Sequence, residues 1–103
     1  MNRIEKLKEY LVASPNDSFL QHALALEYVK LEDDRSAKVL FESVLQFDPA
    51  YTGSYYHLGK LLERTGEAKE AVKVYLKGME VCRQSGDNHA YNELQAAYED
   101  LVY

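Results

Sequence analysis

A repeat of 34 residues is the feature that most constrains how this chain of 103 residues can fold. When the sequence is shifted by 34 residues and compared with itself, apolar and small residues fall on residues of the same kind. The matched pairs are Pro15 with Pro49, Leu24 with Leu58, Ala25 with Gly59, Ala37 with Ala71, Leu40 with Val74 and Phe41 with Tyr75. Because these are mostly residues that fill a core, the repeat indicates a packing arrangement that occurs twice rather than a catalytic site that occurs twice.

Each period carries the pattern of two amphipathic helices. Apolar residues recur at steps of three and four residues, and no segment alternates as a strand would. The four stripes are Leu20, Leu24, Tyr28 and Leu31; Ala37, Leu40, Phe41, Val44 and Leu45; Tyr55, Leu58, Gly59 and Leu62; and Ala68, Ala71, Val72, Tyr75, Met79 and Cys82. Two further stripes, one over residues 4–12 and one over residues 91–101, add a helix at each end. We therefore expect an all-α fold of about six helices, with connections short enough that neighbouring helices run antiparallel.

Turn and capping residues separate the expected helices. Asp33-Asp34 can cap the helix that follows, and Thr65-Gly66 is typical of a helix end, with glycine in the left-handed position. Ser14-Pro15 and Asp48-Pro49 each place a capping side chain before a proline, and we expect each proline to lie in the first turn of a helix.

These spacings resemble the tetratricopeptide repeat, whose pattern is W-x2-L-G-x2-Y, then A-x3-F, then P. The first copy reads Gln21-x2-Leu24-Ala25-x2-Tyr28, then Ala37-x3-Phe41, then Pro49. The second reads Tyr55-x2-Leu58-Gly59-x2-Leu62, then Ala71-x3-Tyr75, with Arg83 in place of the proline. A third opening, Tyr91-x2-Leu94-Gln95-x2-Tyr98, comes two residues late. Residues 3–15 are similar to the second helix of a preceding repeat.

The resemblance implies a right-handed superhelical stack of antiparallel helix pairs, in which small residues let paired helices approach closely and large ones fill the spaces between them. We expect a single domain over residues 1–103, with an N-terminal half repeat at 1–16, repeats at 17–50 and 51–85, and a C-terminal capping helix at 86–103. Such stacks usually need at least three repeats. The end helices would therefore act as lids, or a second copy of the chain would cover an open end.

Charge and targeting signals narrow the classes of partner. The chain has 12 Lys and Arg against 17 Asp and Glu, a net charge of -5, whereas nucleic acids and anionic membranes are bound by clustered positive charge. We therefore expect neither as a partner. No apolar run is long enough for a secretory signal or a membrane span, and Cys82 is the single cysteine. These features favour a cytoplasmic location.

The sequence contains no recognisable catalytic or metal-binding motif. His22, His57 and His89 stand at no metal-ligand spacing from one another or from Cys82, and Cys82 lies on an apolar stripe, as a buried small hydrophobe would. Phosphate-binding glycine loops and nucleophile motifs are also missing. We therefore expect no enzyme activity, no cofactor and no metal.

The resemblance also implies a candidate binding groove, because in this family the first helix of each repeat lines a concave surface that holds a peptide or a helix. The corresponding residues here are His22, Leu26, Lys30, Tyr56, Lys60, Arg64, Asn92 and Ala96. Three of them are cationic, so an acidic or C-terminal segment is a suitable ligand. The opposite interpretation is that these cations are ordinary solvated charges near Glu27 and Glu63.

Two functions follow from these patterns. The first is a non-catalytic adaptor or scaffold that binds a peptide segment or a helix of another protein in the groove. The alternative is a structural protein that self-associates, for example as a homodimer, through exposed end helices.

Overall fold

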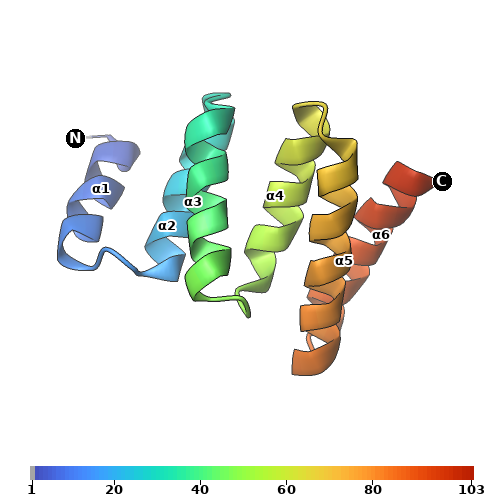
Figure 1. Ribbon diagram of the computed structural model, residues 1–103. Helices are drawn as coiled ribbons and strands as arrows, with labels where there is room; N and C mark the ends of the chain where they lie inside the picture. The colour runs from blue at the N-terminus through green and yellow to red at the C-terminus, as the bar shows by residue number, and fades with distance from the viewer. Residues whose placement is uncertain (1) are drawn as a thin grey trace. The chain divides into compact units, whose positions relative to one another are not determined.

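The computed structural model describes residues 2–103, and within that range it consists of six α-helices and no strand. The helices are α1 (Arg3–Ala13), α2 (Ser18–Lys30), α3 (Asp34–Phe47), α4 (Thr52–Arg64), α5 (Ala68–Ser85) and α6 (Asn88–Val102). Figure 1 shows them in chain order, joined by short connections. The all-α architecture of helical hairpins that the sequence predicts is confirmed.

The helices form two compact units, of which the first ends at Asp48 and the second spans Pro49–Tyr103. In the first unit α2 pairs with α3 and α1 packs on α2, where Leu7 meets Ala23 and Leu24. In the second unit α5 packs against both α4 and α6, and α4 also contacts α6. Each unit therefore contains one hairpin and an additional helix.

The same packing arrangement occurs in both hairpins. Ala25 and Phe41 are 0% exposed in the first unit, and Tyr75 is 0% exposed in the second. Gly59 takes the place of Ala25, and a Cβ atom built on it would lie only 2.2 Å from Cε1 of Tyr75. The small residues that the 34-residue match brings together are therefore buried in both hairpins, and at Gly59 the paired helix leaves no room for a Cβ atom.

The two Pro-containing turns differ from the expectation. Ser14 and Asp48 end α1 and α3 rather than capping the helices that follow, and the prolines lie in the turns. Asp17 caps α2 instead, accepting a hydrogen bond of 2.9 Å from the Leu20 amide, whereas α4 has no side-chain cap. The prediction that each proline lies in a first helical turn is therefore wrong.

The carbonyl groups of these prolines have an equivalent role in both units. The Tyr55 hydroxyl donates a hydrogen bond of 2.8 Å to the carbonyl oxygen of Pro49. Gln21, which replaces the large aromatic of the repeat pattern, donates from Nε2 to the carbonyl oxygen of Pro15, also at 2.8 Å. A glutamine amide thus reproduces the contact of a tyrosine hydroxyl, which explains how the first repeat tolerates this departure.

The turns that end α2 and α4 give a stability prediction. Gly66 has φ of +83°, and Glu32, which lies 34 residues earlier, has φ of +58° in the equivalent position. A side chain in this left-handed region costs about 1 kcal/mol. We expect Glu32→Gly to raise the free energy of unfolding by about 0.5–1 kcal/mol in urea denaturation. Glu32→Ala, which removes the same carboxylate but keeps a Cβ atom, is the matched control, and equal stabilisation by both variants would contradict the backbone explanation.

Candidate functional site

The first three candidate groove residues lie along α2 in the first unit. His22 and Leu26 are half-buried, and Lys30 is exposed. The His22 ring packs against Phe41 in an edge-to-face arrangement with a centroid distance of 5.6 Å. This contact ties the α2 surface to the buried core of the hairpin.

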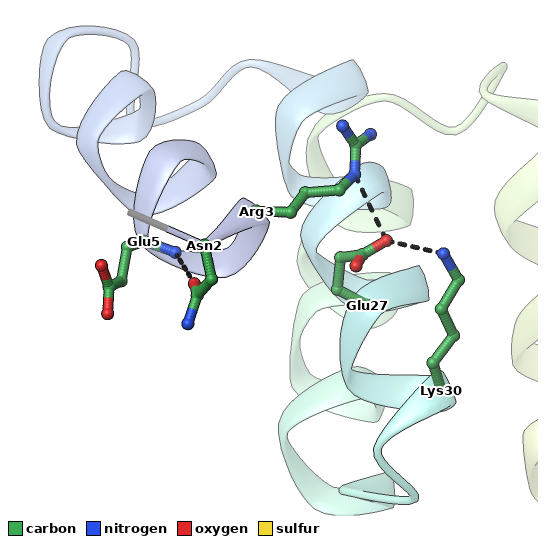
Figure 2. Close-up of polar contacts among 5 residues, drawn as sticks. All are labelled: Asn2, Arg3, Glu5, Glu27 and Lys30. Carbon is green, nitrogen blue, oxygen red and sulfur yellow. Dashed lines mark hydrogen bonds and ion pairs between the residues drawn. The ribbon is translucent and has the colours of Figure 1, made fainter.

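Lys30 belongs to a cluster of charges that joins α1 to α2 (Figure 2). Its Nζ lies 3.0 Å from Oε2 of Glu27, and Nε of Arg3 lies 3.3 Å from the same oxygen. The hydrogen bond from Lys30 and the positive charges of Lys30 and Arg3 lower the pKa of Glu27. Two cations therefore share one carboxylate, and the cluster keeps a net positive charge.

The second unit brings three of the candidate residues together. Tyr56 and Lys60 of α4 and Ala96 of α6 line one hollow of about 220 Å³, together with Glu93, Ala97 and Asp100 of α6. Arg64 and Asn92 are exposed and are not among the residues that line this hollow. The candidate surface of this unit is thus centred on the gap between α4 and α6.

The electrostatic character of the hollow differs from the cationic surface that the sequence favours. Lys60 lies over the Tyr56 ring, with Nζ 5.8 Å from the ring centroid and 3.8 Å from Oε2 of Glu63. Glu93 and Asp100 add two carboxylates from the opposite helix. Sequence reasoning missed both, although Glu93, Ala96 and Asp100 follow one another at steps of three and four residues, which places them on one helix face.

His57, next to Tyr56, makes the stability of the fold depend on pH. Its ring packs edge-to-face against Tyr56 at 5.4 Å, and burial lowers the pKa of His57 below its ordinary 6.5, although the charge of Glu93 acts in the opposite direction. The unfolded chain therefore takes up a proton at a higher pH than the folded chain does, so stability is lost as the pH falls through 6.5.

We expect the free energy of unfolding to decrease between about pH 7.5 and about pH 5.5 by more in the wild type than in His57→Gln, which has no imidazole to protonate. Urea denaturation at both pH values measures the difference. His89→Gln is a control for an exposed histidine, since His89 lies on the surface beside Glu93. An equal pH dependence in the wild type and in His57→Gln would contradict the assignment.

Cys82 and Tyr75 of the second unit are buried in the core rather than exposed at this surface. Cys82 is 1% exposed and burial raises the pKa of its thiol. Burial, followed by the hydrogen bond that its hydroxyl donates to Glu63, raises the pKa of Tyr75.

Among residues 2–103, no three His, Cys, Asp or Glu side chains are grouped to hold a metal ion. In the same range, no helix is both long and apolar enough to cross a membrane.

Comparisons with known proteins agree with the hairpin geometry. The sequence model of the tetratricopeptide repeat matches residues 52–85. The crystal structure of a tetratricopeptide repeat domain protein from Salinibacter ruber is 41% identical to this chain, with a TM-score of 0.79, over 82% of this chain and 94% of that one. A solution NMR structure of a tetratricopeptide repeat domain protein from the same organism is also 41% identical, with a TM-score of 0.81, over 85% and 89%.

A third solved structure, of a protein from Bordetella parapertussis, is similar over a larger part of the chain. It is 25% identical, with a TM-score of 0.85, and covers 99% of this chain and 89% of that one. The comparison with curated proteins gives no match.

Proposed function

Because the chain belongs to the tetratricopeptide repeat family, whose members are in general protein-interaction modules without catalytic activity, we propose that it binds a peptide segment or a helix of another protein. The observation that carries this proposal is the hollow between α4 and α6, in which Tyr56, Lys60 and Ala96 come together. No reacting group is needed for this role, since the affinity comes from burying a side chain of the ligand.

The hollow has the composition of a small binding site. Ala96 and Ala97 provide a floor of short side chains, and the half-buried Tyr56 provides a rigid aromatic wall. Aromatic residues of this kind contribute a large share of the binding free energy at interfaces. The proposed ligand therefore inserts one side chain over the two alanines and against the Tyr56 ring.

Charges around the hollow select the flanking residues of the ligand. Lys60 on α4 suits an acidic group, whereas Glu93 and Asp100 on α6 suit a basic one. We therefore propose a segment that carries charges of both signs, with its acidic end on the α4 side, rather than a uniformly acidic segment.

Peptide selection followed by binding measurements tests the proposal. Peptides selected from a random displayed library on the wild-type chain are labelled, and their affinities are measured by fluorescence anisotropy. We expect Tyr56→Ala to weaken binding about tenfold or more, because the loss of a central aromatic costs about 2 kcal/mol. Ala96→Arg, a change at an exposed position, fills the hollow and abolishes binding while circular dichroism shows an unchanged helix content.

Phe19→Ala is the matched control, because Phe19 is an aromatic residue that is 66% exposed and lies on α2. Its affinity for the selected peptides should equal that of the wild type. Peptides that bind Tyr56→Ala and Ala96→Arg as tightly as they bind the wild type would show that the ligand lies elsewhere and would reject this hollow as the site.

A further inference from the structure

The two ends of the described chain carry complementary halves of a repeat. The segment of α1 has the pattern of a second helix, because it ends just before Pro15 as α3 ends just before Pro49. The segment of α6 has the pattern of a first helix, because Tyr91, Leu94 and Tyr98 follow the spacing of Tyr55, Leu58 and Leu62. Within residues 2–103, no first helix precedes α1 and no second helix follows α6.

The side of α1 and α2 where a first helix would pack is open. One hollow of about 280 Å³ is lined by Asn2, Arg3, Ile4, Glu27, Lys30 and Leu31. A second, of about 350 Å³, is lined by Arg3, Lys6, Leu7 and Tyr10. Arg3 contributes to both hollows, so we treat them as one N-terminal slot. Large apolar side chains remain uncovered there, since Leu31 is 65% and Tyr10 is 58% exposed.

The slot is positively charged. It contains the cations Arg3, Lys6 and Lys30 against the single carboxylate of Glu27, to which Arg3 and Lys30 are both bonded (Figure 2). Burying an uncompensated positive charge is unfavourable, so the surface that covers this slot should supply carboxylates.

The outer side of α6 is open and acidic. Tyr55 and Leu62 of α4 are 4% and 3% exposed, whereas Tyr91 and Tyr98, which lie 36 residues later, are only half-buried. The difference arises because α5 pairs with α4 as its second helix, and α6 has no such partner in the described chain. The α6 segment contains no Lys or Arg, and of its three carboxylates Glu99 lies outside the hollow between α4 and α6, whereas Glu93 and Asp100 line it.

We propose that α6 of one copy of the chain packs into the N-terminal slot of a second copy, so that α6 and α1 together complete a hairpin between the two chains. The occupant of the slot is thus a second copy, favoured by charge and by the matching halves of the repeat. Because each copy has one slot and one α6, the contact is head-to-tail and can be repeated from copy to copy.

Two residues make this contact looser than the hairpins within the chain. Arg3 stands where Ala37 and Ala71 allow close approach, and Gln95 stands where Ala25 and Gly59 do. Long polar side chains at these positions keep the two helices further apart and leave the contact partly hydrated. The association is therefore reversible and depends on protein concentration.

Sedimentation velocity over a wide range of protein concentration tests this proposal on the full chain. For the wild type we expect the average mass to rise above 11.8 kDa as the protein concentration increases. Arg3→Glu with Lys6→Glu blocks the slot. Glu99→Lys with Val102→Lys blocks the exposed side of α6, at whose end Val102 is 40% exposed. Each double variant alone should remain at 11.8 kDa. An equimolar mixture should form a dimer and nothing larger, because one intact slot and one intact α6 surface remain.

Lys69→Glu on α5 is the control for a charge reversal at an exposed position outside both surfaces, and it should assemble as the wild type does. Circular dichroism checks the fold of each variant, and Tyr10→Arg replaces the slot variant if Arg3→Glu with Lys6→Glu unfolds. A wild type that stays monomeric at millimolar concentration, a mixture of blocked variants that stays monomeric, or variants that assemble as the wild type does would each overturn the proposal. The peptide measurements with Tyr56→Ala stand apart from this result, because none of these substitutions lies in the hollow between α4 and α6.

Discussion

Gly59→Val is expected to lower the free energy of unfolding by about 3 kcal/mol or more, because it forces extra atoms into a filled core. A Cβ atom at Gly59 would lie 2.2 Å from Cε1 and 2.6 Å from Cζ of Tyr75. Real Cβ contacts are much longer, so either the α4 backbone or the Tyr75 ring has to move. The ring is 0% exposed and its hydroxyl donates a hydrogen bond to Glu63, so it has no free space to move into.

Urea denaturation followed by circular dichroism measures this loss, and Gly53→Val is the matched control. Gly53 lies on the same helix at an exposed position, so its substitution should change the free energy of unfolding by less than about 1 kcal/mol. The clash itself is tested by combining Gly59→Val with Tyr75→Ala. The double variant should lose less stability than the sum of the two single losses, because the small ring-free side chain makes room for the valine. Additive losses would mean that the close approach is not the cause.

The close approach at Gly59 is also the part of the fold that the sequence predicts best. A 34-residue self-match aligns Ala25 with Gly59 and Phe41 with Tyr75; all four residues are buried, and Gly59 lies against the Tyr75 ring. Repetition makes such positions visible, because the same packing requirement restricts the residue type in both copies. The number of helices and their pairing follow from it.

Helix starts are predicted less well, because several residues in one turn compete for the same cap. Ser14 precedes a proline and has a capping side chain, but Asp17, three residues later, takes the role for α2. The left-handed residue at the end of α2 is Glu32 rather than a glycine, so only its alignment with Gly66 indicates that conformation in the sequence. The local sequence therefore predicts in which turn a helix begins or ends, but it does not predict which residue of that turn is the cap.

The candidate site is the least predictable part, since its character depends on which side chains meet across helices. Periodicity places Tyr56, Lys60 and Ala96 on helix faces, but it does not show that Glu93 and Asp100 face Lys60 across the hollow. It also leaves open whether the Lys30 charge is available to a ligand. In the structure Lys30 and Arg3 both form ion pairs with the carboxylate of Glu27. Both facts move the expected ligand from uniformly acidic to mixed in charge.

Phe41→Ala is expected to have a comparably large effect in the first unit, a loss of about 3–5 kcal/mol of unfolding free energy. Phe41 is 0% exposed and is among the largest fully buried side chains of the chain. Its removal takes away a large buried apolar side chain and leaves a cavity in the core of the first unit. Since small domains are stable by only about 5–15 kcal/mol, the loss is a large fraction of the total.

Urea denaturation of Phe41→Ala measures this loss, and Phe19→Ala is again the control. The same change of residue at a position 66% exposed should cost less than about 1 kcal/mol, so the difference between the two variants reports burial rather than the loss of an aromatic ring as such. Because the His22 ring packs on Phe41, the His22 resonances should shift in the NMR spectrum of Phe41→Ala. Equal stability of the two variants would mean that the α2–α3 hairpin does not depend on this core, and the α2 surface would then have no buried support for its geometry.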